Sequence, residues 1–217
     1  MAKIISMDEA VSLVKEGMSV MVGGFVACGT PPGLIDGLAE KNVKNLTIIT
    51  NDAAKPGLGV GKLQDNGQIK KFIGSFIGQN LSIGEQWQAG TLEVELYPQG
   101  SFVEKIRCAG YGLGGILTPT GVGTKMAEGK QEITVNGKRY LLETPLSADI
   151  ALIRAEKADR FGNLTYKHSA RNFNTAMVTA AKTTIVEVDE IVDQIEPDQV
   201  VTPGVFVKYI VLAKGGK

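Results

Sequence analysis

Short apolar runs rich in Val, Ile and Leu alternate with amphipathic stretches along most of this chain. Runs such as Leu46–Thr50 and Asp149–Arg154 carry few polar positions, as strands buried on both faces do. Between such runs, apolar residues recur with helical spacing, as at Leu34, Ile35 and Leu38. Because strands alternate with helices, the pattern predicts an α/β fold with a mostly parallel sheet, covered by helices on both faces.

The same patterns predict the remaining elements. Further strands are expected at Val20–Val22, Ile69–Phe76, Leu92–Tyr97, Thr184–Val188 and Val205–Leu212. Further helices are expected after Ser6, after Ser101 and at Ala176–Ala181. No internal repeat, low-complexity segment or linker interrupts this order, so the sequence predicts one domain over residues 1–217.

Cap and turn signals mark the ends of several elements. Ser6 followed by Glu9 is a capping-box pattern, and Gly17 is expected to stop the helix that follows. Ser101 is expected to cap the N-terminus of its helix.

The pair Asn136-Gly137 lies between two alternating runs, Ile133–Val135 and Arg139–Leu142. Asn-Gly favours the type I′ turn, so this segment is predicted to be a β-hairpin that leaves the main sheet. The preceding segment, Gly110–Gly123, is dense in glycine and is expected to be a loop.

Composition excludes several functional classes. The chain has 23 basic and 23 acidic residues and no block of like charge, so neither a nucleic-acid nor a membrane partner is predicted. His168 is the only histidine, and no metal site is expected. Two cysteines are too few for a disulfide framework, and the N-terminus lacks a signal-peptide pattern, which together predict a cytoplasmic protein.

The stretch Val20–Pro31 holds the strongest candidate site. A buried strand ends at Gly23-Gly24, a small apolar loop follows, and Thr30-Pro31-Pro32 has the pattern of an N-cap with proline at the first helical position. Ligands of open α/β sheets bind at the carboxyl ends of strands, and a helix N-terminus favours negative charge. The loop lacks the Lys-Ser/Thr of a phosphate cradle, which favours an oxyanion or thioester. The alternative is an ordinary tight turn.

Two other glycine motifs lack the context that their chemistry needs. Gly110–Gly115 matches the dinucleotide fingerprint, but a helix-like segment precedes it and Pro119 follows it, so nicotinamide binding is not predicted. Gly57–Lys62 resembles a phosphate loop only faintly, because Leu63 stands where Ser or Thr would bind magnesium.

Four side chains are candidates for catalysis, each with a structural alternative. Cys28 is a nucleophile if it lies at a helix N-terminus, or else a small buried filler of a tight loop. His168 is a catalytic base or, by the favoured interpretation, a satisfied surface or core histidine, because no nearby residue forms a triad with it. Glu104 and Glu143 lie beside apolar residues and are either perturbed carboxylates or, by the favoured interpretation, solvated or salt-bridged glutamates.

Gln99 follows a predicted strand directly, behind Pro98. We expect its amide at the carboxyl edge of the sheet beside the first glycine loop, where it can donate a hydrogen bond to a developing oxyanion. The alternative is a glutamine that stabilises a turn.

Taken together, these loops resemble the alpha subunit of the family I CoA-transferases, of the acetate/butyrate–acetoacetate (3-oxoacid) type. The family signature corresponds to Glu16-Gly17, an apolar run, Gly23-Gly24-Phe25 and Gly29-Thr30-Pro31, with Glu16 in place of the usual Asp or Asn. The resemblance covers nearly the whole chain and continues through Asn51-Asp52, Pro98–Gly100, Ile106-Arg107, Leu117–Thr124 and Ala170–Asn174.

The resemblance implies a heteromeric enzyme that moves CoA between a short-chain acyl-CoA or 3-oxoacyl-CoA and a free carboxylic acid by a ping-pong mechanism. A coenzyme A thioester is then a substrate, and no permanently bound cofactor is expected. In this family the nucleophilic glutamate belongs to a Ser-Glu-Asn-Gly motif of the beta subunit, and this chain has no such motif. A partner beta subunit in an A2B2 heterotetramer, two alpha and two beta chains, is therefore implied.

The resemblance also assigns roles to residues of this chain. Gln99 should hold the oxyanion. The loop that should line the CoA and acyl site comprises Gly23, Gly24, Phe25, Val26, Ala27, Cys28 and Gly29.

Two rival functions remain for this architecture. A sugar-phosphate isomerase needs its acid and base in one chain and polar phosphate donors, whereas the loop here is apolar at Phe25, Val26 and Ala27. A non-catalytic small-molecule sensor would carry a DNA-binding segment, yet the N-terminus leads straight into the first predicted helix.

Overall fold

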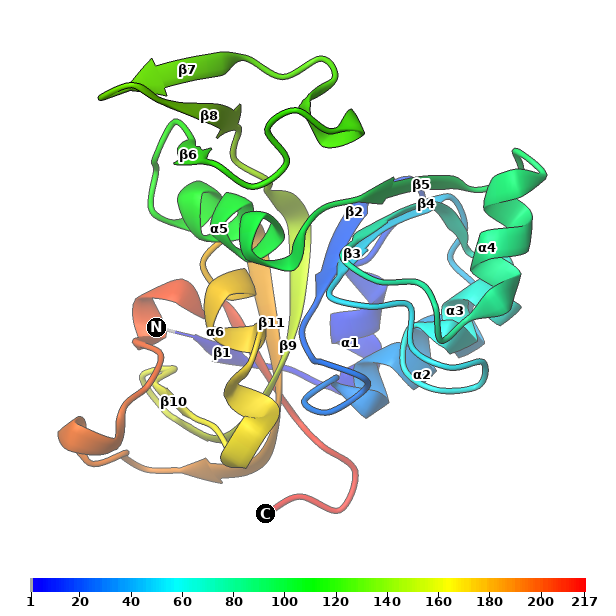
Figure 1. Ribbon diagram of the computed structural model, residues 1–217. Coiled ribbons are helices and arrows are strands. Elements are labelled where there is room, and N and C mark those ends of the chain that lie inside the picture. Colours follow the sequence, from blue (N-terminus) through cyan, green and yellow to red (C-terminus); the bar gives the residue numbers. More distant parts are fainter. Residues whose placement is uncertain (1) are drawn as a thin grey trace.

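A computed structural model describes residues 2–217, and a largely parallel sheet runs through its centre (Figure 1). Its strands lie in the order β1-β12-β11-β9-β2-β3-β4-β5, and every neighbouring pair in this order is parallel. A short strand, β10 (Leu164–Thr165), adds to β9 in the antiparallel sense. In spatial order the main strands are β1 (Lys3–Ile4), β12 (Tyr209–Leu212), β11 (Ala181–Val192), β9 (Ala148–Asp159), β2 (Ser19–Val22), β3 (Leu46–Thr50), β4 (Ile69–Gly74) and β5 (Glu93–Leu96).

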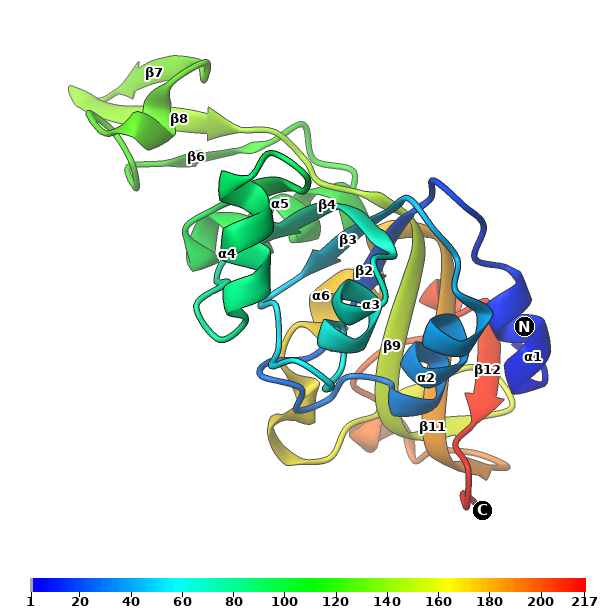
Figure 2. The ribbon, with the colours of Figure 1, turned by 90° about the vertical axis from the view of Figure 1, so that its right-hand side faces the viewer.

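Helices cover both faces of this sheet (Figures 1 and 2). One face packs against α1 (Met7–Ser12), α2 (Pro32–Lys41), α3 (Gly61–Asp65) and α4 (Leu81–Gln88), and the other against α5 (Gln99–Gly110) and α6 (Asn174–Met177). Short 3-10 helices lie at Lys125–Ala127, His168–Arg171, Pro197–Gln199 and Gly204–Phe206.

The side chains of each central strand are therefore divided between two apolar cores, one on each face of the sheet. In β2, Val20 and Val22 join one apolar cluster, and Met21 joins the other. In β3, Ile48 and Ile49 divide in the same way. This explains why the strands read as unbroken apolar runs, and it confirms the predicted α/β fold.

A small antiparallel sheet projects from the main body (Figure 2). It consists of β6 (Ile116–Thr118), β8 (Lys138–Glu143) and β7 (Glu132–Val135), in that order. Asn136 and Gly137 join β7 to β8 with φ of 50° and 76°, so the predicted hairpin is confirmed. The prediction that Gly110–Gly123 is entirely loop is wrong, because β6 pairs with β8, a distant partner that local pattern does not reveal.

Several predicted boundaries also need correction. The first helix has its predicted capping box but ends at Ser12, well before Gly17. The last helix was predicted at Ala176–Ala181, yet α6 ends at Met177 and Ala181 already begins β11.

Two further departures concern whole elements. Helix α4 was not predicted; of its three large apolar residues only Ile83 is buried, while Leu81 and Trp87 are exposed. The last strand begins at Tyr209 rather than Val205, since a 3-10 turn comes first. Within residues 2–217, no helix is both long enough and apolar enough to span a bilayer.

Candidate functional site

The loop between β2 and α2 is built around a buried asparagine. A Cβ on Gly23 would lie 1.9 Å from Oδ1 of Asn174, which is fully buried. That oxygen accepts from the backbone N–H of Arg154 at 3.0 Å, while Nδ2 donates to the carbonyl of Gly29 at 2.9 Å. The missing side chain of Gly23 therefore makes room for Asn174, which is a packing reason that requires no ligand.

Gly24 is required by the backbone as well. Its φ is +122°, and a Cβ would lie 2.3 Å from Oγ1 of Thr30. A substitution such as Gly24→Val therefore deforms the loop itself. Loss of activity in that variant would not show that a ligand approaches this glycine.

A tight turn with unusual residues follows the glycines. Phe25 and Cys28 exchange two backbone hydrogen bonds of 2.9 Å, and between them Val26 and Ala27 have φ of 48° and 64°. This is a two-residue hairpin with both central residues in the left-handed region, where a β-branched residue such as Val is rare. We call residues Phe25–Cys28 the edge turn.

The edge turn is exposed at the carboxyl end of β2. Phe25 and Val26 are 42% and 43% exposed, and Cys28 is exposed with its Sγ 3.4 Å from Oγ of Ser169. The interpretation of Cys28 as a buried filler is therefore wrong. Cys28 also does not lie at a helix N-terminus, since α2 begins only at Pro32.

Three backbone N–H groups of this loop make no hydrogen bond within the described residues. The N–H groups of Phe25, Val26 and Cys28 already donate within the chain. Those of Gly24, Ala27 and Gly29 have no acceptor among residues 2–217. Gly24 is buried, whereas Ala27 and Gly29 are partly exposed, so the N–H groups of these two residues are the candidate donors to an oxyanion.

The N-terminus of α2 is not available to a ligand, contrary to the prediction. The Glu187 carboxylate from β11 accepts from the N–H groups of Gly33 at 3.2 Å and Leu34 at 2.9 Å. Glu187 is 1% exposed and pairs with Arg154 at 2.6 Å. Burial raises the pKa of its carboxyl group, and these donors oppose that shift.

The predicted cap of α2 is displaced by one residue. The N-cap position is Pro31, which makes no side-chain cap, and Pro32 is the first helical residue. Thr30 packs against Gly24 instead.

Gln99 lies at the same edge of the sheet but not beside the edge turn. It is the exposed first residue of α5, and no side-chain hydrogen bond holds it among the described residues. Since β3 and β4 lie between β2 and β5, the two strands are about 14 Å apart at normal strand spacing. Its expected place beside the glycine loop is therefore wrong, while its role as a donor stays a prediction.

Ser101 does not cap this helix. It is the third residue of α5, buried, and its hydroxyl has no partner within residues 2–217. The N-cap position is Pro98.

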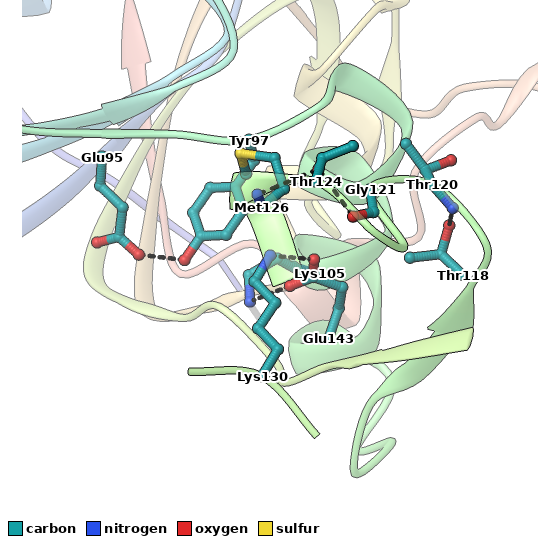
Figure 3. Close-up of polar contacts among 10 residues, drawn as sticks. All are labelled: Glu95, Tyr97, Lys105, Thr118, Thr120, Gly121, Thr124, Met126, Lys130 and Glu143. Carbon is teal, nitrogen blue, oxygen red and sulfur yellow. Dashed lines mark hydrogen bonds and ion pairs between the residues drawn. The ribbon is translucent and has the colours of Figure 1, made fainter. Parts of the chain in front are cut away.

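Glu104 and Glu143, the two candidate carboxylates, are both salt-bridged, which confirms the interpretation favoured from the sequence. Glu104 pairs with Arg107 at 2.6 Å on the surface of α5. Glu143 is 2% exposed and lies between Lys105 at 3.2 Å and Lys130 at 2.5 Å, as Figure 3 shows.

The same lysines lie over the ring of Tyr97, at 4.6 Å for Lys105 and 5.2 Å for Lys130. Burial, together with the Glu95 carboxylate that accepts from its hydroxyl, raises the pKa of Tyr97 far above its usual value. This cluster joins α5 to the small sheet and holds the Glu143 carboxylate in two ion pairs (Figure 3).

A charged cleft of about 820 Å³ opens at the carboxyl ends of β9, β11 and β12, with Arg154, Glu187 and Asp189 in its wall. Neither the edge turn nor Gln99 lines it. Across residues 2–217 no cluster of His, Cys, Asp or Glu has the arrangement of a metal site, and His168 lies exposed on a 3-10 turn.

Comparison with known proteins defines the family. Residues 4–213 match the sequence model of the coenzyme A transferase family. The chain is 48% identical over 217 residues to the acetate CoA-transferase subunit alpha of Escherichia coli K12, covering 99% of both. It is 50% identical over 212 residues to the acetoacetyl-CoA:acetate/butyrate CoA transferase alpha subunit of Clostridium acetobutylicum, covering 97% of both.

Solved structures share the fold. An acyl-CoA transferase of Escherichia coli O157:H7, in a thioester complex with CoA, superposes with a TM-score of 0.86 at 22% identity, over 98% of this chain and 50% of that one. Glutaconate coenzyme A-transferase of Acidaminococcus fermentans gives 0.82 at 20% identity, over 98% and 76%.

This chain belongs to the coenzyme A transferase family. The predicted resemblance and the predicted enzyme class, a CoA-transferase, are thereby confirmed. The relatives give no support to a sugar-phosphate isomerase.

Proposed function

We propose that this chain is the alpha-type subunit of a heteromeric enzyme that moves CoA between a short-chain acyl-CoA or 3-oxoacyl-CoA and a free carboxylic acid. Acetate, butyrate and acetoacetate are the proposed acids. The observation that carries this proposal is the near-full-length identity of 48% and 50% to alpha subunits whose names specify acetate and acetoacetyl-CoA:acetate/butyrate transfer.

The reaction then needs a nucleophile from a partner. A glutamate attacks the thioester carbonyl and expels CoA as the thiolate, which leaves an acyl–enzyme anhydride. The thiolate attacks the enzyme's own carbonyl of that anhydride, which releases the first acid and leaves an enzyme–CoA thioester. The second acid then takes the CoA by the reverse steps. This chain has no Ser-Glu-Asn-Gly motif, and its buried glutamates within residues 2–217 are paired, which supports a nucleophile on a beta subunit.

This chain would supply the oxyanion donors. Each tetrahedral intermediate places negative charge on an oxygen, and one well-placed donor contributes roughly 3 kcal/mol of transition-state stabilisation. The free N–H groups of Ala27 and Gly29 are suited to this task, because they are neutral, partly exposed and held by a packed loop. Gln99 is a second donor, which the sheet order places apart from the first group.

The loop Gly23–Gly29 would also bind the CoA and acyl groups of the substrate. Its apolar tip, Phe25 and Val26, offers a surface to the acyl chain or the pantetheine arm.

The same edge is suited to a partner subunit. Large apolar side chains are exposed after three neighbouring strands: Phe25 and Val26 after β2, Leu58 after β3, and Phe76 after β4. Grouped exposed apolar residues are typical of interaction surfaces. We propose that the beta subunit covers this edge in an A2B2 assembly. A cytoplasmic location and a single domain over 1–217 stay predictions.

The test is transfer of CoA from acetoacetyl-CoA to acetate, measured for the chain, for a beta subunit and for their mixture. We expect turnover only in the mixture. Borohydride should then reduce the trapped enzyme–CoA thioester, and mass spectrometry should place the modification on the beta chain. Robust turnover by this chain alone, or modification of Glu104 or Glu143, would contradict the assignment of roles.

A further inference from the structure

The edge turn has a conformation that its own sequence disfavours. Left-handed φ at two consecutive residues suits Asn and Gly, whereas here the positions hold Val26 and Ala27. Such backbone persists only where surrounding contacts determine it, and it gathers at functional sites. The contact that fixes this turn is therefore informative.

At Val26, the first of the two left-handed residues, that contact is made by Asp52, which lies just beyond the end of β3. Its Oδ2 accepts from the N–H of Val26 at 2.7 Å and from Nδ2 of Asn51 at 2.8 Å, and its Oδ1 accepts from the N–H of Ala54 at 3.0 Å. Asp52 is 4% exposed and has no ion-pair partner among residues 2–217. Three N–H donors surround the carboxylate, and only the one from Val26 belongs to the edge turn.

The chemistry of this site requires a carboxylate. An ionised Asp accepts at both oxygens, whereas an Asn would turn its NH2 group toward at least one of the three donors. Hydrogen bonds to a charged acceptor are also stronger than neutral ones. Asp52 is thus suited to hold Val26 against the conformation that this residue type prefers.

We propose that Asp52 is a positioning residue for CoA transfer: it holds Val26 and Ala27 in the left-handed conformation and so orients the free N–H groups of Ala27 and Gly29. This inference rests on the proposed function of the loop. Asp52 itself contacts neither the substrate nor the reacting atoms, and it acts through the turn. Nothing in the sequence pattern pairs position 52 with position 26, because the contact arises from the adjacency of β2 and β3.

The test is a double-mutant cycle in the complex with the beta subunit. Asp52→Asn is made in the native chain and in a chain carrying Val26→Asn and Ala27→Gly, whose residues adopt the turn without support. In the native turn Asp52→Asn should lower kcat by about tenfold to a hundredfold, as displacement of catalytic groups does, with a smaller change in the KM for acyl-CoA. In the substituted turn the same change should cost less than about threefold, whatever the activity of that background.

A second measurement reports on the turn without any transfer reaction. Cys28 is exposed in the edge turn and Cys108 is fully buried, so iodoacetamide should alkylate Cys28 alone. Asp52→Asn should change the alkylation rate several-fold in the native turn and leave it nearly unchanged in the substituted turn.

Asp159 offers a matched control. It is buried at the end of β9, and its carboxylate accepts from the N–H groups of Phe161 and Asn163 at 2.9 Å, without contact to the edge turn. Asp159→Asn should have the same effect on kcat and on alkylation in both backgrounds. Melting temperatures are compared for all variants, and Asp52→Ser replaces Asp52→Asn if the latter does not fold.

The outcomes separate the two proposals. If the native complex transfers no CoA, the proposed function fails, and the alkylation rates alone decide the role of Asp52 in the turn. Equal effects of Asp52→Asn in both turns by alkylation would overturn the positioning role. Coupling by alkylation with an uncoupled kcat would overturn its link to transfer.

Discussion

Two turns of this molecule share one backbone geometry and have opposite sequences. The hairpin turn Asn136-Gly137 and the edge turn at Val26-Ala27 both have two successive residues at positive φ, at 50° and 76° in the first and 48° and 64° in the second. Asn-Gly adopts this geometry by itself, and the hairpin is exposed and locally paired. Val-Ala does not, and the edge turn depends on residues distant in the sequence.

The supports of the edge turn come from two other segments. Asp52 accepts from Val26, Asn172 donates to the carbonyl of Cys28 at 2.9 Å, and Asn174 donates to that of Gly29. The hairpin turn is thus encoded by its own two residues, whereas the edge turn keeps a disfavoured backbone that contacts from distant residues hold in place.

The largest expected effect is at Gln99, the candidate donor that lies outside the loop Gly23–Gly29. Gln99→Ala should lower kcat by roughly 10²–10³-fold, with a smaller change in the KM for acyl-CoA, as expected for a donor used mainly in the transition state. Steady-state kinetics of the complex with a beta subunit measure this. Asn136→Ala, in the hairpin turn, is the control and should leave kcat unchanged. A kcat that hardly moves in Gln99→Ala would leave the loop Gly23–Gly29 as the proposed source of donors.

Gly23 tests the packing beneath the edge turn. Gly23→Ala should lower the free energy of unfolding by about 3 kcal/mol, because the added Cβ displaces the fully buried Asn174 amide and its hydrogen bonds. Urea unfolding measures it. Gly84→Ala is the matched control, since nothing lies within 4 Å of its Cβ inside α4, and it should stabilise by up to about 1 kcal/mol. Equal stabilities of the two variants would show that the loop relaxes freely around Asn174.

Transfer of the edge-turn residue types into the hairpin turn tests whether left-handed Val and Ala are strained. Asn136→Val with Gly137→Ala places the residue types of the edge turn in the hairpin, where no carboxylate supports them. The double variant should lose about 2 kcal/mol of stability, the strain of left-handed Val and Ala. Chemical denaturation with an unchanged m-value measures this loss. A change below about 0.5 kcal/mol would mean that the edge turn is not strained either.

The sequence predicts the fold well because its strands are buried on both faces. Unbroken apolar runs identify β2, β3 and β9, and the hairpin turn is encoded by two residues. Helix α4, with one buried residue, and the three-residue β6 depend on tertiary contacts, which no local pattern shows.

The site was predictable only in part, for the same reason. The glycines and the small apolar loop predict a ligand site at this edge of the sheet. The structure shows that packing explains both glycines, because a side chain on Gly23 would clash with Asn174 and one on Gly24 would clash with Thr30. Glu187, which caps α2, and Asp52 were not predicted as site residues. The available signals were a polar residue inside a buried strand or just after one and, for Asp52, its place in a segment that carries the family resemblance.

The smallest predicted effect is on the pH dependence of stability, and it concerns the opposite end of the sheet. There Asp149 holds Ser19, the first residue of β2. Asp149 accepts from the N–H of Ser19 at 3.0 Å and from its hydroxyl at 2.8 Å, and it pairs with Lys182 at 2.8 Å. The Lys182 ammonium, followed by the Ser19 donors, lowers the pKa of Asp149 to about 2. A depressed pKa in the folded state stabilises the protein above the pKa of the unfolded chain, near 3.8, and this stabilisation is lost as pH falls toward 2.

The loss with falling pH should be small, because the Asp149 side chain is about one third exposed and solvent screening reduces its contribution to about 1 kcal/mol. Stability measured by denaturant between about pH 4.5 and pH 2 should therefore fall by about 1 kcal/mol more in the native protein than in Asp149→Asn. The alkylation rate of Cys28 should be the same in both proteins, because Asp149 holds the beginning of β2 and Asp52 holds the turn beyond its end. Parallel pH profiles would mean that Asp149 does not anchor the strand, and a changed Cys28 rate would mean that the two ends of β2 are coupled.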